Sequence, residues 1–128
     1  MTLQEAISHE NEEAMKTILA RDPSLVNKPD FRGFTPLVLA TYLQKEKATR
    51  ILLQHEADVN QQDAKGNTAL MGVCYKGLEN LGQLLIDSGA DVNLKNNSGD
   101  TALDFAQKFG KLNMVTLLTK NGALLNKD

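Results

Sequence analysis

Cysteine is nearly absent from the chain: Cys74 is the one thiol among 128 residues. An internal disulfide is therefore excluded, and a lone thiol is typical of proteins kept in a reducing compartment. The first thirteen residues, MTLQEAISHENEE, are polar and acidic and lack the apolar run of a signal peptide. These features predict a cytoplasmic protein.

Long apolar runs and a strong excess of one charge are also missing. No apolar stretch approaches the roughly 20 residues that a membrane-spanning helix needs. Fourteen basic and sixteen acidic residues give a net charge of −2, without the basic stripe typical of a duplex-binding domain. We therefore expect neither a membrane nor a nucleic acid as partner.

Side chains arranged for catalysis or metal binding are scarce as well. The two histidines, His9 and His55, have no paired cysteine and no metal-ligand spacing. No segment matches the phosphate-binding pattern GxxxxGK[ST]. Cys74 falls on the inner side of an expected helix with no identifiable base beside it, so we predict a buried, structural thiol. The sequence predicts no enzyme activity, no metal and no cofactor.

What the chain does have is a repeat with a period of 33 residues. Glycines recur at this spacing in GFTPL, GNTAL and GDTAL, which begin at Gly33, Gly66 and Gly99. The same step relates the asparagines Asn27, Asn60, Asn93 and Asn126 and the leucines Leu19, Leu52, Leu85 and Leu118. Self-similarity at this length predicts a solenoid of stacked units. The units run over about 1–29, 30–62, 63–95 and 96–128.

One unit, residues 63–93, shows what each repeat should form. Gly66 supplies the positive φ of a turn, and Thr68 is suited to cap the helix that follows. We predict a helix over 68–76 that ends at Gly77, and a second helix over 80–87. Such a unit cannot bury its apolar face alone, so neighbouring units must stack.

The segments G-x-T-P-L-x-x-A (33–40) and G-A-D-V-N (89–93) resemble the ankyrin repeat, which has a T-P-L-H-x-A core. The resemblance covers nearly the whole chain. It implies one all-α domain over 1–128, an ankyrin-repeat solenoid of four helix–turn–helix units with β-turn or hairpin tips. Three other residues replace the family's histidine, which is credited with bracing neighbouring turns: Val38, Met71 and Asp104.

The end units and the second unit depart from the pattern. The first unit opens directly at its helix, and Thr119 replaces an apolar residue in the last unit. We therefore expect both ends to be capped and the chain to be a complete four-repeat protein. In the second unit, Gln44 and Glu56 stand where later units have glycine. A left-handed conformation is accordingly expected at Glu56.

In the ankyrin family, partners usually dock on the concave side, which is formed by the turn tips and the exposed side of each first helix. Carried over to this sequence, the resemblance places one arginine, four lysines, one leucine and five aromatic residues on that side. The predicted protein-binding residues are Phe31, Arg32, Phe34, Tyr42, Leu43, Lys65, Tyr75, Lys76, Lys95, Lys108 and Phe109.

Five of the six aromatic residues thus fall on one predicted face, and Phe105 alone aligns with the core. Tyr42 and Tyr75 are 33 residues apart, so we expect them to stack in one column. Aromatic residues and arginine are enriched at the centres of protein interfaces, and the lysines favour an acidic partner. The alternative for each ring is that it folds onto a neighbouring turn or fills a gap between units.

These features predict a non-enzymatic module that binds a protein partner and acts as an adaptor, inhibitor or regulator. The sequence does not identify that partner, and we expect the chain to be monomeric on its own. The alternative is a structural homodimer that assembles through the same aromatic residues.

Overall fold

The computed structural model describes residues 1–124, and the helices follow the order that the repeat predicts. The first helices of the units are α1 (Leu3–Ser8), α3 (Pro36–Tyr42), α5 (Ala69–Lys76) and α7 (Ala102–Lys108). The second helices are α2 (Glu12–Arg21), α4 (Glu46–Gln54), α6 (Glu79–Asp87) and α8 (Leu112–Lys120), and a 3-10 helix, η1 (Pro23–Asn27), follows α2. No strand occurs in this part of the chain, which confirms the all-α prediction. Asn126 lies outside the described residues.

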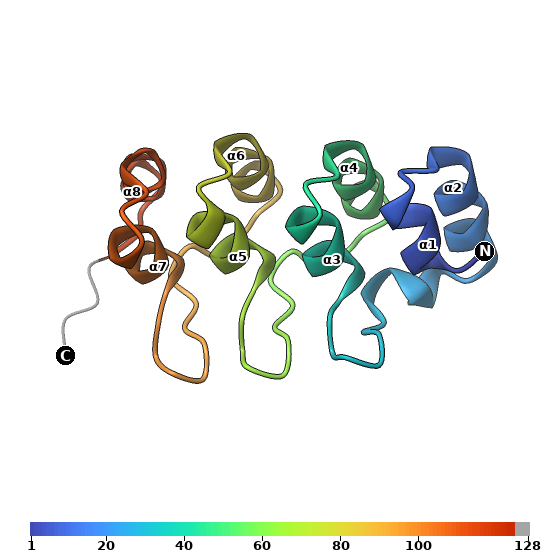
Figure 1. The fold of residues 1–128 in the computed structure, drawn as a ribbon, viewed down its shortest axis with the longest axis horizontal. Coiled ribbons are helices and arrows are strands. Elements are labelled where there is room, and N and C mark those ends of the chain that lie inside the picture. The colour runs from blue at the N-terminus through green and yellow to red at the C-terminus, as the bar shows by residue number, and fades with distance from the viewer. Residues whose placement is uncertain (125–128) are drawn as a thin grey trace.

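The helix pairs stand side by side in one row (Figure 1). The first helices form one layer, with the long turns projecting beyond it, and the second helices form the other layer (Figure 1). Each first helix packs on the first helix of the next unit, while α2 packs on α4 and α6 on α8. Units therefore bury their apolar faces against their neighbours, as a solenoid requires.

A threonine starts each first helix. Its side-chain oxygen accepts a hydrogen bond from the N–H three residues further on, at Thr2, Thr35, Thr68 and Thr101. In the fourth unit Asp104, which replaces the family's histidine, accepts hydrogen bonds from the N–H and hydroxyl of Thr101. The predicted helix over 68–76 is confirmed, with Thr68 as its N-cap. The second helix of that unit ends as predicted and begins one residue earlier.

Left-handed residues end the helices where the sequence places them. Gly77 has a φ of 74° and Gly89 a φ of 96°, as predicted. Glu56 has a φ of 67°, which confirms the expectation for the second unit, and Gln44 has a φ of 57°. Glu10 has a φ of 50°, which the sequence analysis did not foresee. The second unit therefore keeps the turn geometry of its neighbours without their glycines.

The first unit is offset from the repeat by one residue. The turn after its first helix places Glu10 where later units have Gln44, Gly77 and Gly110, because the N–H of each bonds the carbonyl three residues before it. This step is 34 residues rather than 33 from the first unit to the second. Helix α1 is one residue shorter than α3 and α2 one residue longer than α4, so the chain returns to register by the end of α2.

The core follows the apolar columns of the repeat. The leucine series is fully buried: Leu19, Leu52, Leu85 and Leu118. Cys74 is also fully buried, and burial raises the pKa of its thiol to about 12, so the predicted structural thiol is confirmed. Phe105, expected in the core, is half-buried and packs against its edge. Its column, shared with Leu39, lies where the core meets the exposed side of the first helices.

The repeating asparagines join each unit to the next. The side-chain oxygen of each accepts a hydrogen bond, of 2.7 to 2.9 Å, from a backbone N–H about one unit further along the chain. The pairs are Asn27 with Asp58, Asn60 with Asp91 and Asn93 with Leu124. This series explains why the asparagine recurs at the period of the repeat. Along residues 1–124, no helix is both long enough and apolar enough to cross a bilayer.

Candidate protein-binding site

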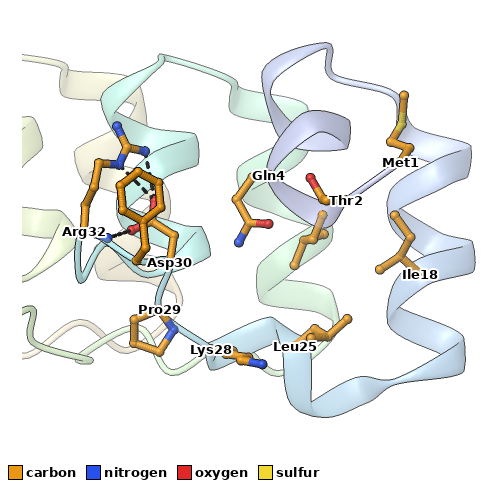
Figure 2. Close-up of a pocket in the computed structure, with 11 residues that line it drawn as sticks. Met1, Thr2, Gln4, Ile18, Leu25, Lys28, Pro29, Asp30 and Arg32 are labelled. Carbon is orange, nitrogen blue, oxygen red and sulfur yellow. Dashed lines mark hydrogen bonds and ion pairs between the residues drawn. The ribbon is translucent and has the colours of Figure 1, made fainter.

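The tip of the second unit carries two phenylalanines around a tied arginine. Asp30 Oδ1 accepts the backbone N–H groups of Arg32 (2.9 Å) and Phe34 (3.0 Å), which fixes the turn. Asp30 Oδ2 accepts Nη2 and Nε of Arg32, at 2.8 and 3.2 Å. Figure 2 shows the arginine side chain folded back onto this carboxylate. The guanidinium carbon lies 5.6 Å from the centre of the Phe31 ring and 4.9 Å from that of Phe34.

This arrangement sets the electrostatics of the tip. Partial burial of Asp30 pushes its pKa upward. The bonds from the Arg32 side chain and from the backbone N–H groups of Phe34 and Arg32 outweigh that effect and leave the pKa of Asp30 below its usual value. The carboxylate therefore stays ionised near neutral pH and balances the charge of Arg32. The tip presents two rings and a neutralised guanidinium to solvent.

A second group of rings lies at the ends of the first helices. Lys76 Nζ lies 3.7 Å from the centre of the Tyr42 ring and donates a hydrogen bond of 2.8 Å to the Tyr42 carbonyl. The Tyr75 ring meets Phe109 edge-on, with ring centres 4.6 Å apart, and Phe109 stacks on Phe105 at 6.4 Å. The rings thus bridge neighbouring units.

The predicted stacking of Tyr42 on Tyr75 is wrong. Each tyrosine contacts the residue 34 positions further on, Lys76 or Phe109, rather than the residue 33 positions further on. The sequence period pairs equivalent residues. The contact falls on the following residue because Lys76 and Phe109, at the ends of their helices, lean toward the preceding unit. A cation therefore covers Tyr42, and the ring column begins only at Tyr75.

None of the five predicted rings is buried between units. We call them the aromatic face, and their exposed fractions are Phe31 96%, Tyr42 63%, Tyr75 50%, Phe109 43% and Phe34 38%. The protein satisfies its buried polar side-chain atoms, with none left unbonded along residues 1–124, and it covers its leucine core. Exposed rings on such a scaffold are available to a partner.

The remaining predicted residues lie at different distances from these rings. Lys108 Nζ lies 5.9 Å from the centre of Phe109. Lys65 and Lys95 are exposed at the tips of later turns, where their carbonyls accept hydrogen bonds from neighbouring turns. Leu43 is half-buried and borders a hollow of about 250 Å³ whose lining is Arg32, Phe34, Val38, Leu39, Tyr42 and Leu43. The structure thus brings the arginine and rings together and leaves Lys65 and Lys95 apart.

Two hollows were not anticipated from the sequence. One, of about 540 Å³, lies between units and is lined by Gln44, Tyr75, Lys76, Leu78, Phe109 and Lys111. The other, of about 650 Å³, lies beside the first unit (Figure 2) and includes Met1, Ile18 and Leu25. A comparison of repeat positions could have indicated the second hollow, because Leu25 stands where Asp58 and Asp91 occur in later units.

Neither hollow has the side chains that catalysis or metal binding needs. Along residues 1–124, no group of three histidine, cysteine or acidic side chains lies close enough to hold a metal ion. The high pKa of buried Cys74 keeps it protonated at neutral pH, so it is not a nucleophile. What these surfaces offer is apolar area and charge, which suit recognition of another molecule.

Comparison with known families identifies the fold. A family model described as three copies of the ankyrin repeat matches residues 56–128, more than half of the chain. A model of a single ankyrin repeat matches residues 32–64. None of the curated proteins matches the chain. Ankyrin repeats generally serve as protein–protein interaction modules and are generally non-enzymatic. By its sequence and its paired helices, the chain belongs to the ankyrin repeat family.

Proposed function

We propose that the protein binds a protein partner on the concave side of the solenoid, through the aromatic face, and acts as an adaptor, inhibitor or regulator without catalysis. The observation that carries this proposal is the exposure of five rings on one side of a scaffold whose core is otherwise covered. A cytoplasmic location, which fits the single unpaired thiol, is part of the proposal.

The tip of the second unit supports the proposal on energetic grounds. Burying an exposed phenylalanine contributes roughly 2–3 kcal/mol, and Phe31 is almost wholly exposed. Asp30 already fixes the backbone of the tip and the Arg32 side chain, so little conformational entropy is lost there on binding. The tip therefore has the features of an interface anchor, with Tyr42 beside it bordering the same small hollow.

Affinity capture from an extract of the native cells, with mass spectrometry, tests the proposal. The variant carries Phe31→Ala and Tyr42→Ala together. Since both side chains are exposed, we expect its melting temperature to stay close to that of the wild-type protein while the captured partner is lost. Leu112→Ala is the matched control, because Leu112 is also exposed but lies outside the aromatic face. Unchanged capture by the folded double variant would contradict the proposal.

Self-association is the second candidate function. Two copies could cover the same rings, and the net charge of −2 is too small to hold copies apart strongly. Light scattering over a range of concentrations separates the two functions. A mass that doubles with concentration, and returns to that of one chain in the double variant, would favour the homodimer. A constant single-chain mass supports capture of a different protein.

A further inference from the structure

The hollow lined by Gln44, Tyr75, Lys76, Leu78, Phe109 and Lys111 contains two lysines and no carboxylate. The ion pairs along residues 1–124 are Arg32 with Asp30 and Arg50 with Glu46, so neither lysine of the hollow is paired. Glu79 lies with Lys111 in a neighbouring hollow, where its Oε2 accepts a hydrogen bond of 3.1 Å from Asn113. Two half-buried positive charges thus border a surface without a compensating acid.

Both lysines are held in place by their surroundings. Lys76 is fixed by its hydrogen bond to the Tyr42 carbonyl and by the Tyr42 ring. Lys111 lies with its stem across Gly77, since a Cβ at Gly77 would come within 3.0 Å of the Lys111 Cδ. A lysine that is already ordered loses less side-chain entropy when it binds an anion. The hollow is therefore preorganised for negative charge.

The first unit shows what a carboxylate does at this level of the solenoid. Glu10, on the turn after α1, reaches the start of α4 in the next unit, where its Oε2 accepts the backbone N–H groups of Lys47 (3.2 Å) and Ala48 (3.5 Å). In the later units, the residue at the same turn position is Gln44 or Gly77. The helices α6 and α8, whose N-caps Leu78 and Lys111 line the hollow, have no side-chain cap. The internal carboxylate of the first junction has no counterpart here.

We propose that this hollow binds a carboxylate side chain of an acidic peptide, with Lys76 and Lys111 as its contacts and an apolar residue of the peptide covering Tyr75 and Phe109. The inference rests on the proposed function, because it names the chemistry of the partner on the same side of the molecule. Two fixed lysines beside two exposed rings complement a segment in which glutamate or aspartate alternates with apolar residues.

Nuclear magnetic resonance titration of the ¹⁵N-labelled protein tests the inference. The probes are a hexapeptide of alternating glutamate and leucine, the same peptide with glutamine in place of glutamate, and inorganic phosphate. We expect the glutamate peptide to shift the amide signals of Lys76, Gly77 and Lys111. The glutamine peptide should bind about tenfold more weakly, the size of one charge-assisted hydrogen bond. Raising the salt from about 50 to about 300 mM should weaken the glutamate peptide alone.

Matched variants locate the effect. Gln44→Glu adds a negative charge to the hollow, and Glu10 shows that a glutamate is tolerated at this left-handed turn position. We expect it to weaken the glutamate peptide about tenfold, as should Lys111→Gln, which removes a positive charge. Gln54→Glu makes the same change on an exposed part of α4 outside the hollow and should leave binding unchanged.

Several outcomes would overturn the inference. These are equal binding of the two peptides, shifts at the tip of the second unit instead of the hollow, no binding at millimolar peptide, or phosphate acting as strongly as the peptide. Each would leave the proposed function standing, because the capture experiment depends on Phe31 and Tyr42 and not on the lysines. Loss of capture selectivity would in turn not alter the peptide result.

Discussion

Single residues of this protein can be judged against their counterparts one unit away. Glu56 has a φ of 67° at a position where the third and fourth units have Gly89 and Gly122. The turn keeps its geometry because the hydrogen bond from the Ala57 N–H to the Leu52 carbonyl matches that from the Ala90 N–H to the Leu85 carbonyl. The strain of a side chain in the left-handed region is therefore carried by the surrounding packing.

Glu56→Gly should stabilise the protein by about 0.5–1 kcal/mol, because it removes this strain and the Glu56 side chain is exposed. Urea unfolding monitored by circular dichroism measures the change. Glu13→Gly is the control, since Glu13 is exposed inside α2, where glycine should destabilise by about 1 kcal/mol. A loss of stability in both variants would mean that the Glu56 turn depends on its side chain.

At the scale of the elements, the turns differ in how tightly they pack. The tips of the third and fourth units are joined by the Asn97 N–H bonded to the Lys65 carbonyl at 2.9 Å, and by the Asn97 side chain bonded to the Ala64 carbonyl at 3.0 Å. No backbone hydrogen bond along residues 1–124 joins the tip of the second unit to that of the third. The phenylalanine-bearing tip is consequently the freer one.

Two glycine substitutions should separate backbone strain from turn packing. Gly33 and Gly66 have φ values of 87° and 80°, so alanine at either should cost about 1 kcal/mol in strain. A Cβ at Gly66 would also lie 2.8 Å from the Asn97 backbone nitrogen, whereas one at Gly33 would lie 3.8 Å from the Ala64 Cβ. We therefore expect Gly66→Ala to lose at least about 2 kcal/mol more than Gly33→Ala in urea unfolding. Equal losses would show that the tip of the fourth unit moves freely.

The helices were predictable from the sequence, while their detailed contacts were not. Threonine caps, glycine turns and buried leucines all follow local rules that recur at a fixed period, so Thr68, Gly77 and Leu85 fell where expected. The contact of Tyr42 with Lys76 depends on how neighbouring units are turned relative to one another, which a period cannot show. Likewise, the offset at Glu10 arises from compensating changes in two helix lengths. The hollow between Lys76 and Lys111 was missed for the same reason.

At the scale of the whole molecule, the junction between the second and third units is the weakest. Its tips share no backbone hydrogen bond, and α4 and α6 pack less closely than the other successive second helices. Its asparagine, Asn60, reaches the Gly89 carbonyl at 3.5 Å, while Asn93 reaches the Gly122 carbonyl at 3.1 Å at the next junction. Because units in a solenoid contact only their neighbours, such a junction divides the chain into two blocks.

Native-state hydrogen exchange should reveal these blocks when the weak junction is cut. Asn60→Ala removes the acceptor of the Asp91 N–H and should cost about 1 kcal/mol at that junction. Amides of α1 to α4 should then exchange about five- to tenfold faster relative to those of α5 to α8, whose tips stay bonded together. Asn93→Ala, the matched variant, should raise exchange mainly in α7 and α8, because the Leu124 N–H bonds Asn93. Uniform acceleration of all eight helices by Asn60→Ala would mean that the units unfold together, since exchange through global opening affects every helix alike.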